Sequence, residues 1–272
     1  LQEPSLELVM QQGLSQRSAP YAWRLIATAL SFVVGANFSQ SAITSGIYAG
    51  IASGIAISCL YAALALGPIS IVSPLTAVIS AIIPVIFDLA TGAKLGPFAL
   101  VAIGLVLVAV VLVAFVPGQD FRLPSLRALI YSVGAGLGFA GIFVFLDGAP
   151  SDSGLATLIV MRIVGVALML VGLAYAFFRY RPKQFLETEI FGRSLIWLVL
   201  LAGSGDVLGN VFFLVATRAG ELAIAAVLTS LYPVGTILLA RIVLKERIAK
   251  SQSLGIVLAI GACVLIAIGK PA

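Results

Sequence analysis

Asp206 is an ionisable side chain near the middle of an otherwise small and apolar stretch, Gly-Ser-Gly-Asp-Val-Leu-Gly-Asn-Val-Phe-Phe, at residues 203–213. Asn210 follows four residues later, so a helix would place both polar side chains on one face. A carboxylate in such a place could hold a ligand ammonium group, carry an exchangeable proton, or pair with an arginine such as Arg162. The residues leave the choice between a functional site and a structural ion pair open.

The composition indicates which solvent surrounds this stretch. The 272 residues are 61% hydrophobic and 10% charged, with a mean hydropathy of +1.17. Apolar runs long enough to cross a hydrocarbon core of about 30 Å recur along the chain. They predict an all-α, multi-pass membrane protein that contacts lipid and no nucleic acid. The expected spans are residues 20–36, 46–65, 70–90, 97–116, 126–146, 155–178, 194–217, 221–243 and 252–269.

Metal and cofactor chemistry has little support in the residue types. Cys59 and Cys263 both lie inside apolar runs, and the sequence contains no histidine, so neither a disulfide framework nor a metal cluster is indicated. The stretch Gly136-Leu-Gly-Phe-Ala-Gly141 matches a dinucleotide-binding pattern, but it lies inside an apolar run with no preceding strand. We therefore expect no metal and no cofactor, and we expect these glycines to form a helix-packing surface.

A second glycine row has the spacing of a helix contact. Gly46, Gly50 and Gly54 recur every four residues, which lets another helix cross closely. Nothing in the row requires a ligand.

The chain also repeats itself. Two homologous halves, residues 1–116 and 126–272, are the simplest explanation, and an odd number of spans per half would invert one half relative to the other, as in many secondary transporters. Only four spans are recognisable in the first half, so Leu6-Glu-Leu-Val-Met10 is expected to end a first helix that is truncated or missing. The matches are Ala49-Gly50 with Ala202-Gly203, Gly67 with Gly220, Leu75-Thr76 with Leu228-Thr229, and Trp23-Arg24-Leu-Ile with Met161-Arg162-Ile-Val.

These features resemble a known family. They include the paired Arg24 and Arg162, and the segment Leu228-Thr-Ser-Leu-Tyr-Pro233 running to Leu244-Lys-Glu-Arg-Ile248. In these features the chain is similar to the ten-helix EamA-like members of the drug/metabolite transporter superfamily. The resemblance implies two inverted five-helix repeats and a secondary transporter, typically an exporter of small metabolites such as amino acids, in the bacterial inner membrane. The first-half turn Thr91-Gly-Ala-Lys-Leu95 departs from the pattern because it lacks the glutamate found at Glu246.

The candidate substrate-binding residues lie on runs that correspond to the cavity-lining helices of that family. Aromatic faces can stack a substrate, and hydroxyl groups can fix its polar atoms. Arg24, close to Pro20, is better explained by a side chain that snorkels to the membrane interface. The candidates are Asp206, Asn210, Arg162, Tyr48, Tyr61, Ser80, Tyr131, Thr229 and Tyr232, with no residue assigned to catalysis or metal binding.

Three classes of function remain open. A secondary transporter, with a small-molecule substrate and a coupling proton, explains the repeat and the polar stripe of Asp206 and Asn210. An intramembrane enzyme would need a nucleophile or general base with its partner, and the sequence offers only isolated carboxylates and hydroxyls. A membrane scaffold would suit the glycine rows but leaves Asp206 without a task. The transporter is therefore the favoured interpretation, and the oligomeric state is not encoded.

Overall fold

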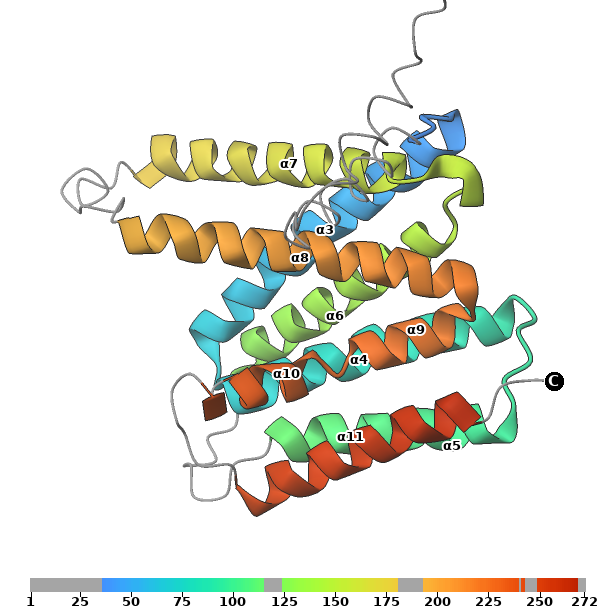
Figure 1. Ribbon diagram of the computed structural model, residues 1–272. Coiled ribbons are helices and arrows are strands. Elements are labelled where there is room, and N and C mark those ends of the chain that lie inside the picture. Colours follow the sequence, from blue (N-terminus) through green and yellow to red (C-terminus); the bar gives the residue numbers. More distant parts are fainter. Residues whose placement is uncertain (1–35, 115–123, 181–192, 240, 243–248, 269–272) are drawn as a thin grey trace, which may run out of the picture.

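The structure is a computed structural model that describes residues 36–114, 124–180, 193–239, 241–242 and 249–268. Every regular element of these residues is helical (Figure 1). The elements are α3 (Gln40–Leu66), α4 (Ile69–Ala90), α5 (Pro97–Ala114), α6 (Leu126–Asp147), η1 (Ser151–Ser153), α7 (Ala156–Tyr180), α8 (Arg193–Ala219), α9 (Leu222–Thr229), α10 (Tyr232–Leu239) and α11 (Lys250–Ile268).

The helices have the length and composition of membrane spans. Seven apolar stretches of the described residues are long enough to cross a bilayer, one of them formed by α9 and α10 together, and α5 is a shorter apolar helix. The prediction of an all-α membrane protein is confirmed. The expected span at residues 20–36 and the helix end at Leu6–Met10 lie outside the described residues.

Local capping explains where two of the helices begin. The Ser39 hydroxyl accepts a 3.2 Å hydrogen bond from the backbone N–H of Ala42, and Ser125 does the same for Ala128. These bonds satisfy N–H groups that have no acceptor inside a helix. The cap at Ser39 starts α3 at Gln40, earlier than the expected span at 46–65, because capped polar residues extend the helix beyond its apolar run.

The expected span at 221–243 is present over Leu222–Leu239, but it is interrupted, because the chain forms two short helices there. The break falls at Ser230 and Leu231, just before Pro233. A proline has no N–H to donate, and its ring collides with the carbonyl four residues earlier. The N–H of Val234 instead bonds the carbonyl of Leu231 at 2.8 Å, which makes a tight turn between α9 and α10.

Small residues let α3 approach two neighbours closely. A Cβ atom added to Gly46 or Gly50 would lie 2.7 Å from the Cβ of Val160 or Val164 on α7. On the side facing α6, a Cβ on Gly138 would lie within 2.8 Å of Ala56. Both glycine rows are therefore helix-packing surfaces, as predicted, and they allow α3 to cross α6 and α7 (Figure 1).

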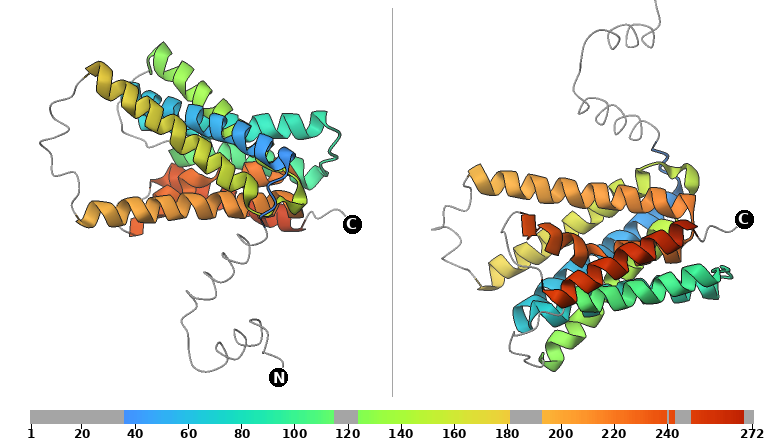
Figure 2. Two further views of the ribbon diagram at one scale, coloured as in Figure 1. Left: turned by 90° about the horizontal axis from the view of Figure 1, so that it is seen from above. Right: turned by 60° about the horizontal axis from the view of Figure 1, so that its bottom comes forward.

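The remaining helices complete the bundle. α4 packs between α6 and α9, and α5 runs beside α11 in both figures (Figures 1 and 2). One apolar core joins α3, α6, α7, α8 and α9, and a second joins α4, α5, α9 and α11. Each core draws residues from both predicted halves of the chain, so the two halves are packed into one body.

Candidate functional site: a cavity within the helix bundle

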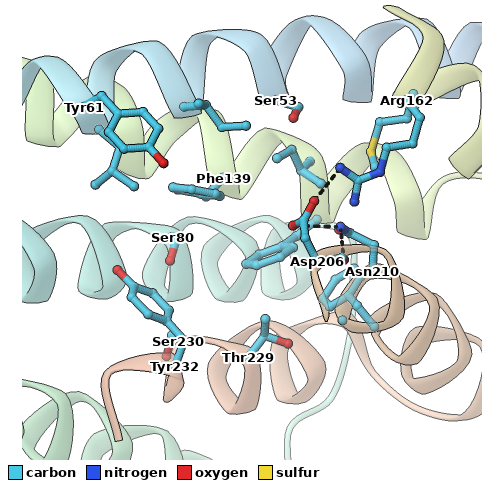
Figure 3. A pocket seen from close by; sticks show the side chains of 17 residues that line it. Ser53, Tyr61, Ser80, Phe139, Arg162, Asp206, Asn210, Thr229, Ser230 and Tyr232 are labelled. Carbon is cyan, nitrogen blue, oxygen red and sulfur yellow. Dashed lines mark hydrogen bonds and ion pairs between the residues drawn. The ribbon is translucent and has the colours of Figure 1, made fainter. Parts of the chain in front are cut away.

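A cavity of about 540 Å³ lies among α3, α4, α6, α7, α8, α9 and α10 (Figure 3). Its volume falls in the range of small-molecule binding sites. It has an apolar and aromatic wall with a few polar side chains. Its lining residues are Ser53, Ile57, Leu60, Tyr61, Ser80, Phe139, Ile142, Phe143, Met161, Arg162, Asp206, Gly209, Asn210, Phe213, Thr229, Ser230 and Tyr232.

An ion pair between neighbouring helices marks one end of the polar lining. The Nη1 atom of Arg162 on α7 contacts the Oδ2 atom of Asp206 on α8 (Figure 3). Asn210, one turn beyond Asp206, donates from Nδ2 to the Asp206 carbonyl at 2.8 Å and lies 3.5 Å from its Oδ1 atom. The sequence left two roles open for Asp206, a functional site or an ion pair with Arg162. The structure forms the ion pair, and both of its partners line the cavity.

The Arg162 guanidinium has spare donor capacity. Its Nη2 atom is buried and has no hydrogen-bond partner among the described residues. A buried donor without an acceptor is costly, and a guanidinium fork matches a carboxylate, which can accept two parallel hydrogen bonds. Arg162 lines the cavity, so a shift of its buried Nη2 atom toward that space would let it bind an additional anionic or carbonyl oxygen.

Hydroxyl groups occupy the opposite part of the lining. Ser80, Thr229 and Ser230 donate to backbone carbonyls of their own helices at 2.9, 2.8 and 2.6 Å. Tyr232 donates across to the Ser73 carbonyl on α4 at 3.2 Å. Since each hydroxyl uses its proton on the protein, its oxygen lone pairs remain able to accept a hydrogen bond. This part of the cavity suits a donor such as an ammonium group.

Seven of the nine predicted substrate-binding residues line this cavity, and two tyrosines do not. Tyr48 is 53% exposed and stacks on Phe145 with ring centroids 5.3 Å apart. Tyr131 is 40% exposed. Both tyrosines lie on cavity-lining helices, but neither is among the residues that line the cavity.

Sequence reasoning missed much of the cavity wall. Phe139, Phe143 and Phe213 line it, and the last two stack with centroids 4.5 Å apart. Nothing in an apolar run distinguishes such phenylalanines from core residues. Ser53 was also missed, although it follows Ala49-Gly50 at the position where Asp206 follows Ala202-Gly203, and that repeat correspondence could have found it.

A smaller cavity of about 190 Å³ lies between α3 and α7. It shares Ser53, Ile57, Met161 and Arg162 with the larger one and extends past Gly165 to Leu170. Arg162 therefore lies where the two spaces meet. The titratable side chains that line the larger cavity are Arg162, Asp206, Tyr61 and Tyr232.

Fold and cavity together define a multi-pass helical membrane protein with an internal polar site. The sequence pattern of the EamA-like transporter family matches residues 126–268, which is more than half of the chain. The chain belongs to that family, within the drug/metabolite transporter superfamily. It is therefore a membrane transporter of small molecules.

Two further comparisons bear on the fold. A solved structure described only as "Crystal structure of protein" aligns with a TM-score of 0.60 and 17% sequence identity, covering 84% of this chain and 87% of that one. At this identity the likeness shows a shared fold and nothing about substrate. The comparison with curated proteins gave no match.

Proposed function

We propose that the chain is a secondary transporter that exports small metabolites, with amino acids as the preferred class, across the bacterial inner membrane. The cavity is its substrate site, open to one side of the membrane at a time. The observation that carries the proposal is the buried, unpartnered Nη2 atom of Arg162 beside Asp206. An amino acid has both complementary groups, a carboxylate and an ammonium group.

The geometry gives each part of an amino acid a partner. Its carboxylate would bind Nη2 of Arg162, and its ammonium group would bind Asp206 or a hydroxyl oxygen of Thr229. An apolar side chain would pack against the aromatic wall at Phe139 (Figure 3) and at Phe143. Stacking and apolar contacts supply affinity, while the few polar groups fix orientation.

Asp206 is also the proposed proton carrier. When Asp206 is ionised, it holds Arg162 through the ion pair. An ionised Asp206 would also bind the ammonium group of the substrate. A proton taken up from the outside would neutralise the carboxylate, weaken its contact with that ammonium group and favour substrate release there. Loss of the proton on the inside would restore the charge for the next substrate, so protons would enter as substrate leaves. Transport would then depend on the pH of both compartments.

Purified protein in liposomes tests the proposal. Vesicles loaded with unlabelled phenylalanine should accumulate radiolabelled phenylalanine from outside by exchange, in a saturable manner that protein-free vesicles lack. Chemical conversion of the solute would instead indicate an intramembrane enzyme. If no compound in a panel of amino acids and other small metabolites were exchanged or converted, the result would indicate a scaffold and contradict the proposal.

A further inference from the structure

The helices α3 and α7 touch near their N-terminal ends and then diverge (Figure 1). A Cβ atom added to Gly50 would lie 2.7 Å from the Cβ of Val164. One turn later, a Cβ on Gly54 would lie 3.6 Å from the Cβ of Leu168. A Cβ on Gly165 would have no atom of α3 closer than 3.9 Å. The divergence leaves the smaller cavity of about 190 Å³ between the two helices, which is called the α3–α7 groove below.

The α3–α7 groove is long and narrow. Its wall on α7 runs from Arg162 to Leu170, which corresponds to roughly 12 Å at 1.5 Å per residue. A volume of about 190 Å³ spread over that length has room for an extended chain and little room for a branch. An apolar cavity of about 150 Å³ can hold benzene, so the groove is large enough for a butyl group.

One end of the groove is polar and the rest is apolar. Arg162 and Ser53 line both the groove and the larger cavity. The Ser53 hydroxyl oxygen lies 3.9 Å from the place of a Cβ on Gly165. Among the described residues, the remainder of the groove wall has no charged or hydroxyl side chain. Met161 and Met169 belong to this wall, and their flexible side chains can adapt to a chain that lies against them.

Continuity with the larger cavity indicates what occupies the groove. In the proposed function, a substrate carboxylate binds Arg162 and its ammonium group binds Asp206, and these two residues are in contact. In an amino acid, both groups are attached to the carbon that carries the side chain, so the side chain begins where the two cavities meet. A broad aromatic ring fits the wall at Phe139, whereas a narrow chain can enter the groove and bury its methylene groups there.

We propose that the α3–α7 groove is a side-chain subsite that selects substrates with unbranched apolar side chains. Norleucine, which has a butyl side chain, is the model ligand, and methionine has an unbranched side chain of the same length. The inference rests on the proposed function and adds a specificity to it. Gly165 determines this specificity, because a larger side chain at that position would fill the groove beside Ser53.

Binding of two isomers tests the subsite without any transport measurement. Norleucine and isoleucine have the same atomic composition, so a difference in their affinity reflects the shape of the side chain. Calorimetric titration of the protein in lipid nanodiscs should show at least about fourfold tighter binding of norleucine than of isoleucine. Norvaline, which lacks one methylene group of norleucine, should also bind about fourfold more weakly than norleucine.

Substitutions at two glycines of α7 locate the effect. Gly165→Leu fills the groove and should remove both differences in affinity. Gly172→Leu is the matched control, because Gly172 lies two turns further along α7 and is not among the residues that line either cavity. It should retain both differences. Gly165→Ala adds a single methyl group at an ordinary contact distance from α3, so it keeps the test open if Gly165→Leu does not fold. It should weaken norleucine binding about fourfold relative to norvaline binding.

The inference is overturned if norleucine binds no more tightly than isoleucine, or if no amino acid binds. It is equally overturned if both Gly165 variants bind norleucine as the parent does, which would leave the groove to a lipid acyl chain. Exchange of phenylalanine in liposomes without the preference for norleucine would refute the subsite and leave the proposed function intact. A preference for norleucine that is lost in the Gly165 variants, without exchange of any amino acid, would instead refute the proposed function alone.

Discussion

The carboxylate of Asp88, near the C-terminal end of α4, accepts a 2.9 Å hydrogen bond from the backbone N–H of Ala223 in the first turn of α9. The N-terminal residues of a helix have N–H groups without acceptors in that helix. Glu221, at the N-cap position of α9, makes no side-chain capping bond. Asp88 therefore caps α9 from a different helix, and the contact joins the two predicted halves of the chain.

Removal of this cap should destabilise the protein. Asp88→Ala leaves the Ala223 N–H without its acceptor, and loss of an N-cap acceptor costs about 0.5–2 kcal/mol. We expect a lower melting temperature in detergent, measured by intrinsic fluorescence. Asp88→Asn keeps an oxygen acceptor and should lose less stability. Equal losses for both substitutions would show that the hydrogen bond at Ala223 contributes nothing.

Glu221 should make stability depend on pH. Burial, and then the charge of Asp88, raise the pKa of the Glu221 carboxyl above its usual value of 4.5. Its contribution to stability is therefore fully present below pH 4.5 and is lost as pH rises through the raised pKa. Glu221→Gln cannot ionise, so its melting temperature should rise relative to the parent between pH 4.5 and neutrality. A constant difference across that range would contradict this.

Two glycines on the neighbouring helices α5 and α11 should respond oppositely to one added methyl group. A Cβ on Gly255 of α11 would lie 2.6 Å from Val113 Cγ2 and 2.8 Å from the Ala109 carbonyl on α5, whereas a Cβ on Gly104 meets nothing within 4 Å. Gly255→Ala should cost about 1–3 kcal/mol of overpacking. Gly104→Ala should be neutral or stabilising by up to about 1 kcal/mol, because alanine favours helix. Chemical denaturation of both variants measures the contrast, and equal effects would refute the close α5–α11 packing.

The free Nη2 atom of Arg162 predicts a preference for carboxylates. Phenylalanine should raise the melting temperature more than phenethylamine, which has the same ring and ammonium group but no carboxylate, because a bound ligand stabilises the fold by mass action. Arg162→Gln should abolish the difference between the two compounds. Larger stabilisation by phenethylamine would show that the cavity selects cations.

Hydropathy predicted the helices well because a bilayer demands long apolar helices from every spanning segment. It could not predict which prolines interrupt a helix. Pro74 and Pro84 lie inside α4, which continues through both, while the chain breaks just before Pro233. The difference depends on whether neighbouring groups satisfy the freed carbonyls, which is a tertiary property.

The candidate site was predictable where charge made a residue conspicuous. Asp206 and Arg162 stand out because ionised groups in a membrane are costly and need partners. Tyr48 and Phe139 illustrate the limit. Tyr48 lies on a cavity-lining helix but outside the lining, and Phe139 lines the cavity. Which face of an apolar helix points inward depends on the crossing of its neighbours, and a run that is apolar all round does not encode it.

Transport by Asp206→Asn in liposomes tests the central claim most directly. The substitution preserves size and removes the charge that binds Arg162, so the protein should still fold. Phenylalanine exchange should fall about tenfold or more, which is the effect of losing roughly 1.4 kcal/mol of binding. The pH dependence of exchange should flatten. Asp152→Asn, in the α6–α7 loop outside the cavity, should exchange at the parent rate. Two results would contradict a substrate and proton role and leave Asp206 a structural ion-pair partner. One is exchange and pH dependence of Asp206→Asn equal to those of the parent. The other is unfolding of Asp206→Asn that a second substitution, Arg162→Gln, rescues.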